Sequence, residues 1–189
     1  MTADILVPFI AVGLAELGDK TQLSILLLSS KTNKHLHLLL GATLAFSVVD
    51  GLAVLAGSWI ANIVPINFLK VFSGIIFIIF GALMLREAMA STENEVNDQS
   101  KSYFKSSFLT GFVVILLTEW GDKTQIASGL FATRYNALMV LIGTVAALVL
   151  LSAMAIYLGK FVSNRVDTKL MTRIAGVLFI LMGISFFLF

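Results

Sequence analysis

The heptapeptide Glu16–Gln22 reads ELGDKTQ, and it occurs a second time at Glu119–Gln125 as EWGDKTQ. Only the second of the seven positions differs between these two copies, called the first and the second copy below. Each copy places two carboxylates and one ammonium near the middle of an apolar stretch long enough to span a bilayer. A charged side chain at that depth costs about 2.5–3.5 kcal/mol on the insertion scale, so its presence indicates a function. We expect the two copies to build one site together.

The composition predicts an all-α integral membrane protein. Hydrophobic residues make up 58% of the 189 residues and charged residues 13%, and the mean hydropathy is +0.97. A water-soluble fold of this length cannot bury so much apolar surface. The net charge of +2 is too small to indicate a nucleic-acid partner, and the lack of cysteine excludes disulfides and thiolate metal sites. The first apolar segment lacks the pattern of a signal peptide, so we expect it to be a retained helix.

Six apolar segments have the length of a membrane-spanning helix, which needs about 20 residues. They are Ile5–Leu28, Leu38–Ile60, Phe68–Met89, Phe108–Phe131, Leu138–Phe161 and Leu170–Phe189. The polar run between the third and fourth segments is typical of a linker without a core of its own. The predicted organisation is therefore a three-helix unit over 1–90, a linker over 91–107 and a second three-helix unit over 108–189.

The two units are predicted to be inverted repeats of each other. The heptapeptides are separated by 103 positions, and the apolar segment Gly74–Gly81 matches Gly176–Gly183 at a separation of 102. Because each unit contains three spans, an odd number, the second unit must cross the membrane in the opposite sense to the first. Inverted repeats of this kind place a substrate site near the membrane midplane, at the interface between the halves.

The distribution of basic residues predicts the orientation in the membrane. One face of the predicted bundle carries nine of them, whereas the other carries only Lys70 and Arg134. The nine are Lys31, Lys34, Arg86, Lys101, Lys105, Lys160, Arg165, Lys169 and Arg173. Because positively charged loops remain in the cytoplasm, the linker is predicted to be cytoplasmic and both termini to lie outside.

On two continuous helices, the polar residues of each copy would form one stripe, because residues three and four apart share a helix face. If the stripes face each other, four carboxylates converge, and hydroxyl and amide oxygens add to them. Such an all-oxygen set suits Ca²⁺, Mg²⁺ or Mn²⁺ as a transported substrate, with no permanently bound cofactor. The four carboxylates and two lysines have a net charge of −2, which one divalent cation neutralises. The predicted metal ligands are Glu16, Asp19, Glu119 and Asp122, with Thr21, Gln22, Thr124 and Gln125 as additional polar ligands.

The two lysines are predicted to act as gates. Lys20 would lie on the cytoplasmic side of Glu16 and Lys123 on the external side of Glu119, because their helices run in opposite directions. Each would pair with a carboxylate while its own side is closed. The motif glycines, Gly18 and Gly121, permit either close helix packing or a local helix break, and we favour close packing.

Asp50 is a further acid in the middle of the second predicted span. We interpret it as a proton relay or an extra ligand. The alternative is a carboxylate that accepts a hydrogen bond from a neighbouring hydroxyl such as that of Ser47. Its counterpart in the second half, at a separation of 102, is Ser152.

These heptapeptides resemble the double motif Glu-apolar-Gly-Asp-(Lys/Arg)-(Thr/Ser) of the cation/proton exchanger family of transmembrane protein 165, also called uncharacterised protein family 0016. Glu16–Thr21 and Glu119–Thr124 match it at every position, and the similarity covers essentially the whole chain. The resemblance implies two inverted three-helix halves and export of Mn²⁺ or Ca²⁺ from the cytosol in exchange for protons. For a bacterial protein it implies manganese export across the plasma membrane.

Three alternatives remain open. An exporter of small organic cations, such as basic amino acids, would need aromatic groups beside the acids, and only Trp120 offers one. A non-transporting membrane scaffold would tolerate neutralisation of Glu16 and Asp19. Structural ion pairs within each copy would leave Asp19 and Asp122 without partners. An enzyme is not expected, because the helices contain no nucleophile–base pair. The sequence does not indicate an oligomeric state.

Overall fold

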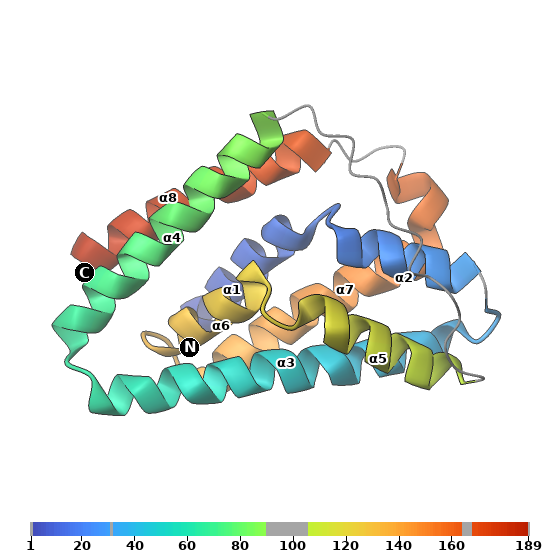
Figure 1. The fold of residues 1–189 in the computed structure, drawn as a ribbon, viewed down its shortest axis with the longest axis horizontal. Helices are drawn as coiled ribbons and strands as arrows, with labels where there is room; N and C mark the ends of the chain where they lie inside the picture. Colours follow the sequence, from blue (N-terminus) through green and yellow to red (C-terminus); the bar gives the residue numbers. More distant parts are fainter. Residues whose placement is uncertain (1, 31, 90–105, 164–167, 189) are drawn as a thin grey trace.

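The computed structural model describes residues 2–30, 32–89, 106–163 and 168–188, and these form helices without any strand (Figure 1). This result confirms the all-α fold class for the described residues. Most of the predicted linker 91–107 lies outside the described residues. The helices are α1 (Thr2–Glu16), α2 (Lys20–Ser30), α3 (His35–Ile63), α4 (Ile66–Met89), α5 (Ser107–Glu119), α6 (Lys123–Ala132), α7 (Ala137–Ser163) and α8 (Thr168–Leu188).

Three stretches of the described chain are long and apolar enough to cross a membrane: His35–Ile63, Asn67–Arg86 and Ala137–Tyr157. They correspond to the second, third and fifth predicted spans. Ser107–Glu119 and Thr172–Phe187 are shorter apolar helices. The prediction of one continuous helix for the first and for the fourth span is wrong, because each is divided into two helices at the heptapeptide.

Both divisions are tight turns that the glycines make possible. The carbonyl of Glu16 accepts from the Asp19 N–H at 3.1 Å, and the carbonyl of Glu119 accepts from the Asp122 N–H, also at 3.1 Å. Gly18 has a φ of 87° and Gly121 a φ of 84°. A type II turn requires such a positive φ at its third residue, which glycine adopts without steric cost. Both glycines therefore lie at helix breaks, which is the alternative that we did not favour, and at Gly121 no atom lies within 4 Å of an added Cβ, so the expectation of close packing is wrong there.

The residues after each glycine start the next helix. Asp122 is the N-cap of α6, and its carboxylate accepts from the Thr124 N–H at 3.5 Å. Three positions later, the Gln125 side chain accepts from the Gly121 N–H at 2.7 Å, and Gln22 accepts from the Gly18 N–H at 3.1 Å. The heptapeptide is thus a turn followed by a helix start, and it does not form the continuous polar stripe predicted from its spacing.

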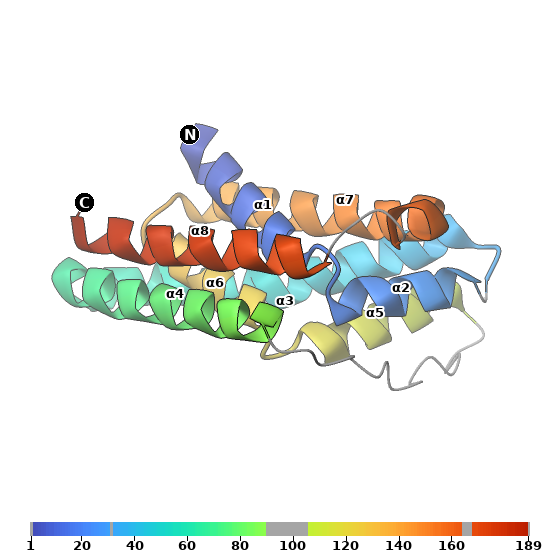
Figure 2. The same ribbon diagram turned by 90° about the horizontal axis from the view of Figure 1, so that it is seen from above.

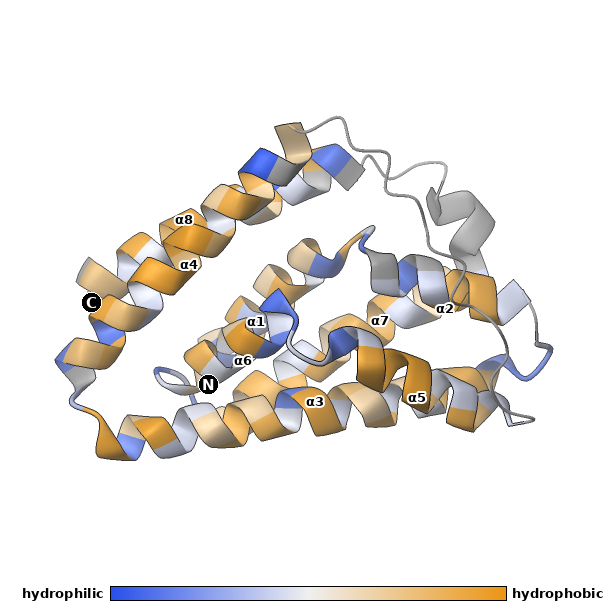
Figure 3. Ribbon diagram, in the orientation of Figure 1, coloured by the Kyte–Doolittle hydropathy of each residue, from blue (hydrophilic) through white to orange (hydrophobic). Residues whose placement is uncertain are grey.

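The two longest helices, α3 and α7, each pack against several of the shorter ones. They pack against each other, α3 packs against α5 and α6, and α7 packs against α1 and α2. The helices α4 and α8 form a closely packed pair. Figure 3 shows hydrophobic residues along most of α3, α4 and α8, with hydrophilic residues at helix ends and at the two turns.

Residues that correspond in the two sequence repeats make equivalent close contacts between helices. A Cβ on Gly41 would clash with the Phe108 carbonyl, and a Cβ on Gly143 would clash with the Ile5 carbonyl. Gly41 and Gly143 are 102 positions apart, and Ile5 and Phe108 are 103 apart. The helix pair α3–α5 therefore approaches as closely as α7–α1, and at equivalent positions.

The pair α4–α8 lies nearer to one end of the molecule. Phe77 of α4 contacts Phe131 of α6 at a ring-centroid distance of 4.9 Å, and Phe179 and Phe186 of α8 at 5.4 and 5.5 Å. In addition, α8 packs against α1. Figures 1 and 2 both show α2 and α5 towards the opposite end from α4 and α8. The pair thus covers the half-helices α1 and α6 and does not extend in the same way over α2 and α5.

Candidate metal site between the two turns

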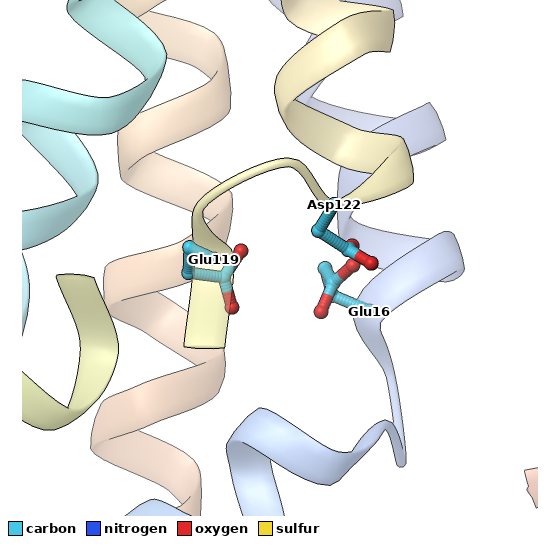
Figure 4. Close-up of side chains that lie close together, drawn as sticks. All are labelled: Glu16, Glu119 and Asp122. Carbon is cyan, nitrogen blue, oxygen red and sulfur yellow. The ribbon is translucent and has the colours of Figure 1, made fainter. Parts of the chain in front are cut away.

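Three carboxylates converge where the two turns meet. Oxygen atoms of Glu16, Glu119 and Asp122 all lie within 4.8 Å of one another (Figure 4). Glu16 ends α1, Glu119 ends α5 and Asp122 begins α6, so the turns bring the three groups together. Glu16 and Glu119 are each only 2% exposed. The structure therefore groups three of the four predicted ligands, two buried and Asp122 half-buried, in one cluster to which both copies contribute.

The fourth predicted ligand, Asp19, forms an ion pair with Lys123. The Lys123 ammonium also lies 3.9 Å from Oε1 of Glu16. Both contacts cross from the second copy to the first, so Lys123 does not form the ion pair with Glu119 that a structural role within one copy would require. The side chain of Lys20, the other predicted gate, lies outside what the structure describes.

Glu16 has an incompletely satisfied carboxylate. Its Oε1 is fully buried and accepts no hydrogen bond, and the Lys123 ammonium lies 3.9 Å from it. A buried ionised oxygen is stable only when it is paired or coordinates a cation. This oxygen is therefore suited to bind a cation.

The threonines of the two copies support the carboxylates. The Thr21 hydroxyl donates to Oε1 of Glu119 at 2.6 Å, and the Thr124 hydroxyl donates to Oδ2 of Asp122 at 3.3 Å. Thr21 thus binds a carboxylate of the other copy, whereas Thr124 binds one of its own.

The two glutamines stabilise the backbone around the site. Besides accepting from the glycine N–H groups, Gln22 donates to the Glu16 carbonyl at 2.6 Å, and Gln125 donates to the Val49 carbonyl of α3 at 3.2 Å. Both side-chain oxygens are therefore engaged by backbone groups in this structure.

Asp50 lies on α3 and is 1% exposed. It accepts a hydrogen bond from the Ser128 hydroxyl of α6 at 2.9 Å. The partner suggested from the sequence, Ser47, instead donates to the Thr43 carbonyl of its own helix. Ser128 was not among the predicted site residues. Its position one helical turn after Thr124 was the available sequence signal, because residues four apart share a helix face.

Comparison with known proteins places the chain in a family. The model of the family described as "Divalent cation/proton antiporter GDT1" matches residues 4–92 and 107–188, which include both copies of the heptapeptide. No solved structure matches the chain at a significant level. The family is one of transporters, which agrees with the expectation that the chain is not an enzyme.

Individual relatives match over almost the whole chain. A Vibrio cholerae protein named "Putative manganese exporter" is 28% identical over 176 residues, which cover 92% of this chain and 85% of the relative. A GDT1-like protein of Synechocystis is 28% identical over 186 residues, covering 90% of this chain and 89% of the relative. The resemblance inferred from the two heptapeptides is confirmed: the chain belongs to the GDT1 family of divalent cation/proton antiporters.

Proposed function

We propose that this protein exports Mn²⁺ from the cytoplasm in exchange for protons, with Ca²⁺ as the second candidate ion. The observation that carries this proposal is the cluster of Glu16, Glu119 and Asp122, in which both glutamates are buried and to which both copies contribute. Carboxylate oxygens are the ligands that hard divalent cations prefer, and no cysteine is present to favour a softer metal. The name of the Vibrio relative favours manganese.

The proposed ligands are Glu16, Glu119 and Asp122, joined by Asp19 once Lys123 leaves it. Thr21 and Thr124 hold the carboxylates, and Gln22 and Gln125 hold the turns. These four residues provide further oxygens when a metal ion displaces their hydrogen bonds. One divalent cation then balances the net charge of −2 of the two copies.

The proposed architecture is six membrane crossings in two inverted halves, 1–90 and 108–189, joined by a cytoplasmic linker at 91–107. Two crossings are the broken pairs α1–α2 and α5–α6. Support comes from the equivalent close approaches at Gly41 and Gly143, which follow the separation of the sequence repeat. Broken helices that end at a central site are typical of transporters with inverted repeats. From the distribution of basic residues, we place both termini outside the bacterial plasma membrane.

In the proposed cycle, protons and the metal ion compete for the same carboxylate oxygens. Lys123 neutralises Asp19 and Glu16 when no metal is bound, as its present contacts suggest. An entering divalent cation displaces the ammonium, and its departure lets the ammonium return. We assign Lys20 the corresponding role on the cytoplasmic side. In proteoliposomes, Lys20→Ala and Lys123→Ala should each weaken the coupling between metal and proton movement, and normal coupling in both variants would contradict the gating roles.

A transport assay with purified protein in liposomes tests the proposal. Mn²⁺, Ca²⁺ or lysine is offered against an imposed pH gradient, and movement of each solute and of protons is recorded. We expect Mn²⁺ flux that depends on the gradient and reverses with it. Gradient-dependent lysine flux without metal flux would favour the organic-cation exporter. The absence of any flux from correctly folded protein would favour the scaffold.

A further inference from the structure

The carboxylate of Asp50 is the buried acid that the proposed metal cluster does not use. It is 1% exposed, and the Ser128 hydroxyl is its hydrogen-bond donor in the described chain. The charged groups that act on it from the helices packed against α3 are Glu119 and Asp122, which are carboxylates as well. An ionised carboxylate in such surroundings lacks the pairing that buried charge requires. Binding a proton would remove this conflict.

Ser128 is placed to accommodate both forms of Asp50. Its hydroxyl oxygen lies 2.9 Å from Oδ1 of Asp50, 2.9 Å from the Thr124 carbonyl and 3.4 Å from the Thr144 hydroxyl. The single hydroxyl proton serves one acceptor at a time, while the oxygen can itself accept. When Asp50 is ionised, Ser128 donates to it. When Asp50 carries a proton, Asp50 donates to Ser128, and Ser128 turns to the Thr124 carbonyl.

A chain of hydrogen-bonding groups connects Asp50 with the metal cluster. Ser128 and Thr124 are one turn apart on α6, and the Thr124 hydroxyl donates to Asp122 at 3.3 Å. Ser128 and Thr124 therefore lie between Asp50 and Asp122, the carboxylate ligand at the end of this chain of contacts. Because the charges of Asp122 and Glu119 act on Asp50, the charge of a divalent cation held by these two carboxylates would act on it as well, without Asp50 being a ligand.

The second half has no equivalent acid. Ser152 stands at the corresponding position, and its hydroxyl donates to the Leu148 carbonyl of its own helix at 2.7 Å. The metal ligands occur in both halves, whereas this acid occurs once.

We propose that Asp50 is a dedicated proton-carrying group of the exchange, separate from the metal ligands. This inference rests on the proposed function. Asp50 releases its proton to the water on the side from which the metal ion enters, because the positive charge of the ion favours the ionised carboxylate. It takes up a proton from the opposite side when the ion leaves. The proton bound to Asp50 thus adds one to those displaced from the ligands.

The variant Asp50→Asn tests this assignment by comparing two transport modes in proteoliposomes. Exchange of labelled for unlabelled Mn²⁺ at equal pH on both sides requires metal binding and conformational change, but no net proton movement. Net Mn²⁺ transport driven by a pH gradient requires metal binding, conformational change and net proton movement. We expect the variant to retain exchange within about twofold and to lose about tenfold or more of gradient-driven transport. Asp50→Glu should restore part of the gradient-driven transport, because it restores a carboxyl group.

Ser47→Ala and Ser152→Ala are the matched controls, since each hydroxyl bonds only its own helix backbone in the described contacts. Both should leave the two modes unchanged. Ser128→Ala should slow gradient-driven transport more than exchange. Equal loss of both modes in Asp50→Asn and Ser128→Ala, or normal gradient-driven transport by Asp50→Asn, would overturn the inference. Failure of the wild-type protein to move Mn²⁺ in either mode would instead overturn the proposed function.

Discussion

The two copies of the heptapeptide differ at one position of seven, yet their side chains make different contacts. In the first copy, Asp19 pairs with Lys123 of the second copy. In the second copy, Asp122 caps its own helix, and Glu119 accepts from Thr21 of the first copy. The backbone turn is the same in both, and the next helix begins at the equivalent lysine, Lys20 or Lys123. Sequence alone thus determines the local conformation, whereas the packing of the two halves determines which charged groups meet.

The helices that surround the two broken pairs also differ from one side of the turns to the other. The pair α4–α8 contacts α1 and α6, one half-helix from each broken pair, and lies away from α2 and α5 in Figures 1 and 2. In the proposed architecture of two inverted halves, the second conformation is reached when the two halves exchange their environments. The two heptapeptides are nearly identical but make different contacts, as expected if the structure is one of these two conformations.

The largest expected effect is the loss of transport when either copy loses one carboxylate. Glu16→Gln and Glu119→Gln keep side-chain size and remove charge, and each should lower Mn²⁺ transport by about 100-fold or more. The measurement is initial uptake in proteoliposomes. Asp4→Asn, which makes the same kind of change in the first turn of α1, is the control and should remain active. Retention of substantial transport by either glutamate variant would mean that one copy is dispensable.

The next largest effect is expected at the close helix contacts that both halves contain. Gly41→Ala and Gly143→Ala introduce a methyl group against the carbonyls of Phe108 and Ile5, and each should destabilise the protein by about 1–3 kcal/mol. Thermal unfolding in detergent measures the change. Gly51→Ala is the control in the same helix as Gly41, because its Cβ meets no atom within 4 Å. Equal stability of all three variants would show that the equivalent close approaches are not tight contacts.

A smaller effect is expected at Lys123, the lysine of the second copy that contacts carboxylates of the first. Lys123→Ala removes the cation that competes with a metal ion for Asp19 and Glu16. Mn²⁺ should bind to this variant about tenfold more tightly, a change of about 1.4 kcal/mol. Equilibrium binding in detergent provides the measurement, with Lys123→Arg as the charge-retaining comparison. Unchanged or weaker affinity in Lys123→Ala would contradict the proposed competition.

The smallest effect is expected where the two sequences differ. Trp120→Leu makes the second copy identical to the first. Because Trp120 is 60% exposed and follows Glu119 in the turn, the substitution should change unfolding free energy by less than about 0.5 kcal/mol. Mn²⁺ transport should stay within about twofold of wild type in the uptake assay. A large loss would show that the aromatic ring is part of the substrate site, as the organic-cation alternative requires.

The sequence predicted that carboxylates of both copies converge, and three of the four do so in the structure, but it did not predict the helix geometry around them. The apolar residues on both sides of each copy have no break in hydropathy, so length alone predicted a continuous helix. A glycine followed by Asp122 and, three residues later, Gln125 was a local signal for a turn and a helix start. The contact of Lys123 with Asp19, and that of Ser128 with Asp50, depend on how distant helices pack. No spacing within one segment could predict them.

We propose that the two copies form one metal site, not two. The most direct test is the stoichiometry of Mn²⁺ bound at equilibrium to purified protein, measured for the wild type, Glu16→Gln and Glu119→Gln. We expect one ion per chain for the wild type and none, at the same concentrations, for either variant. Two ions per wild-type chain, with one remaining in each variant, would show two independent sites and rule out a single shared site.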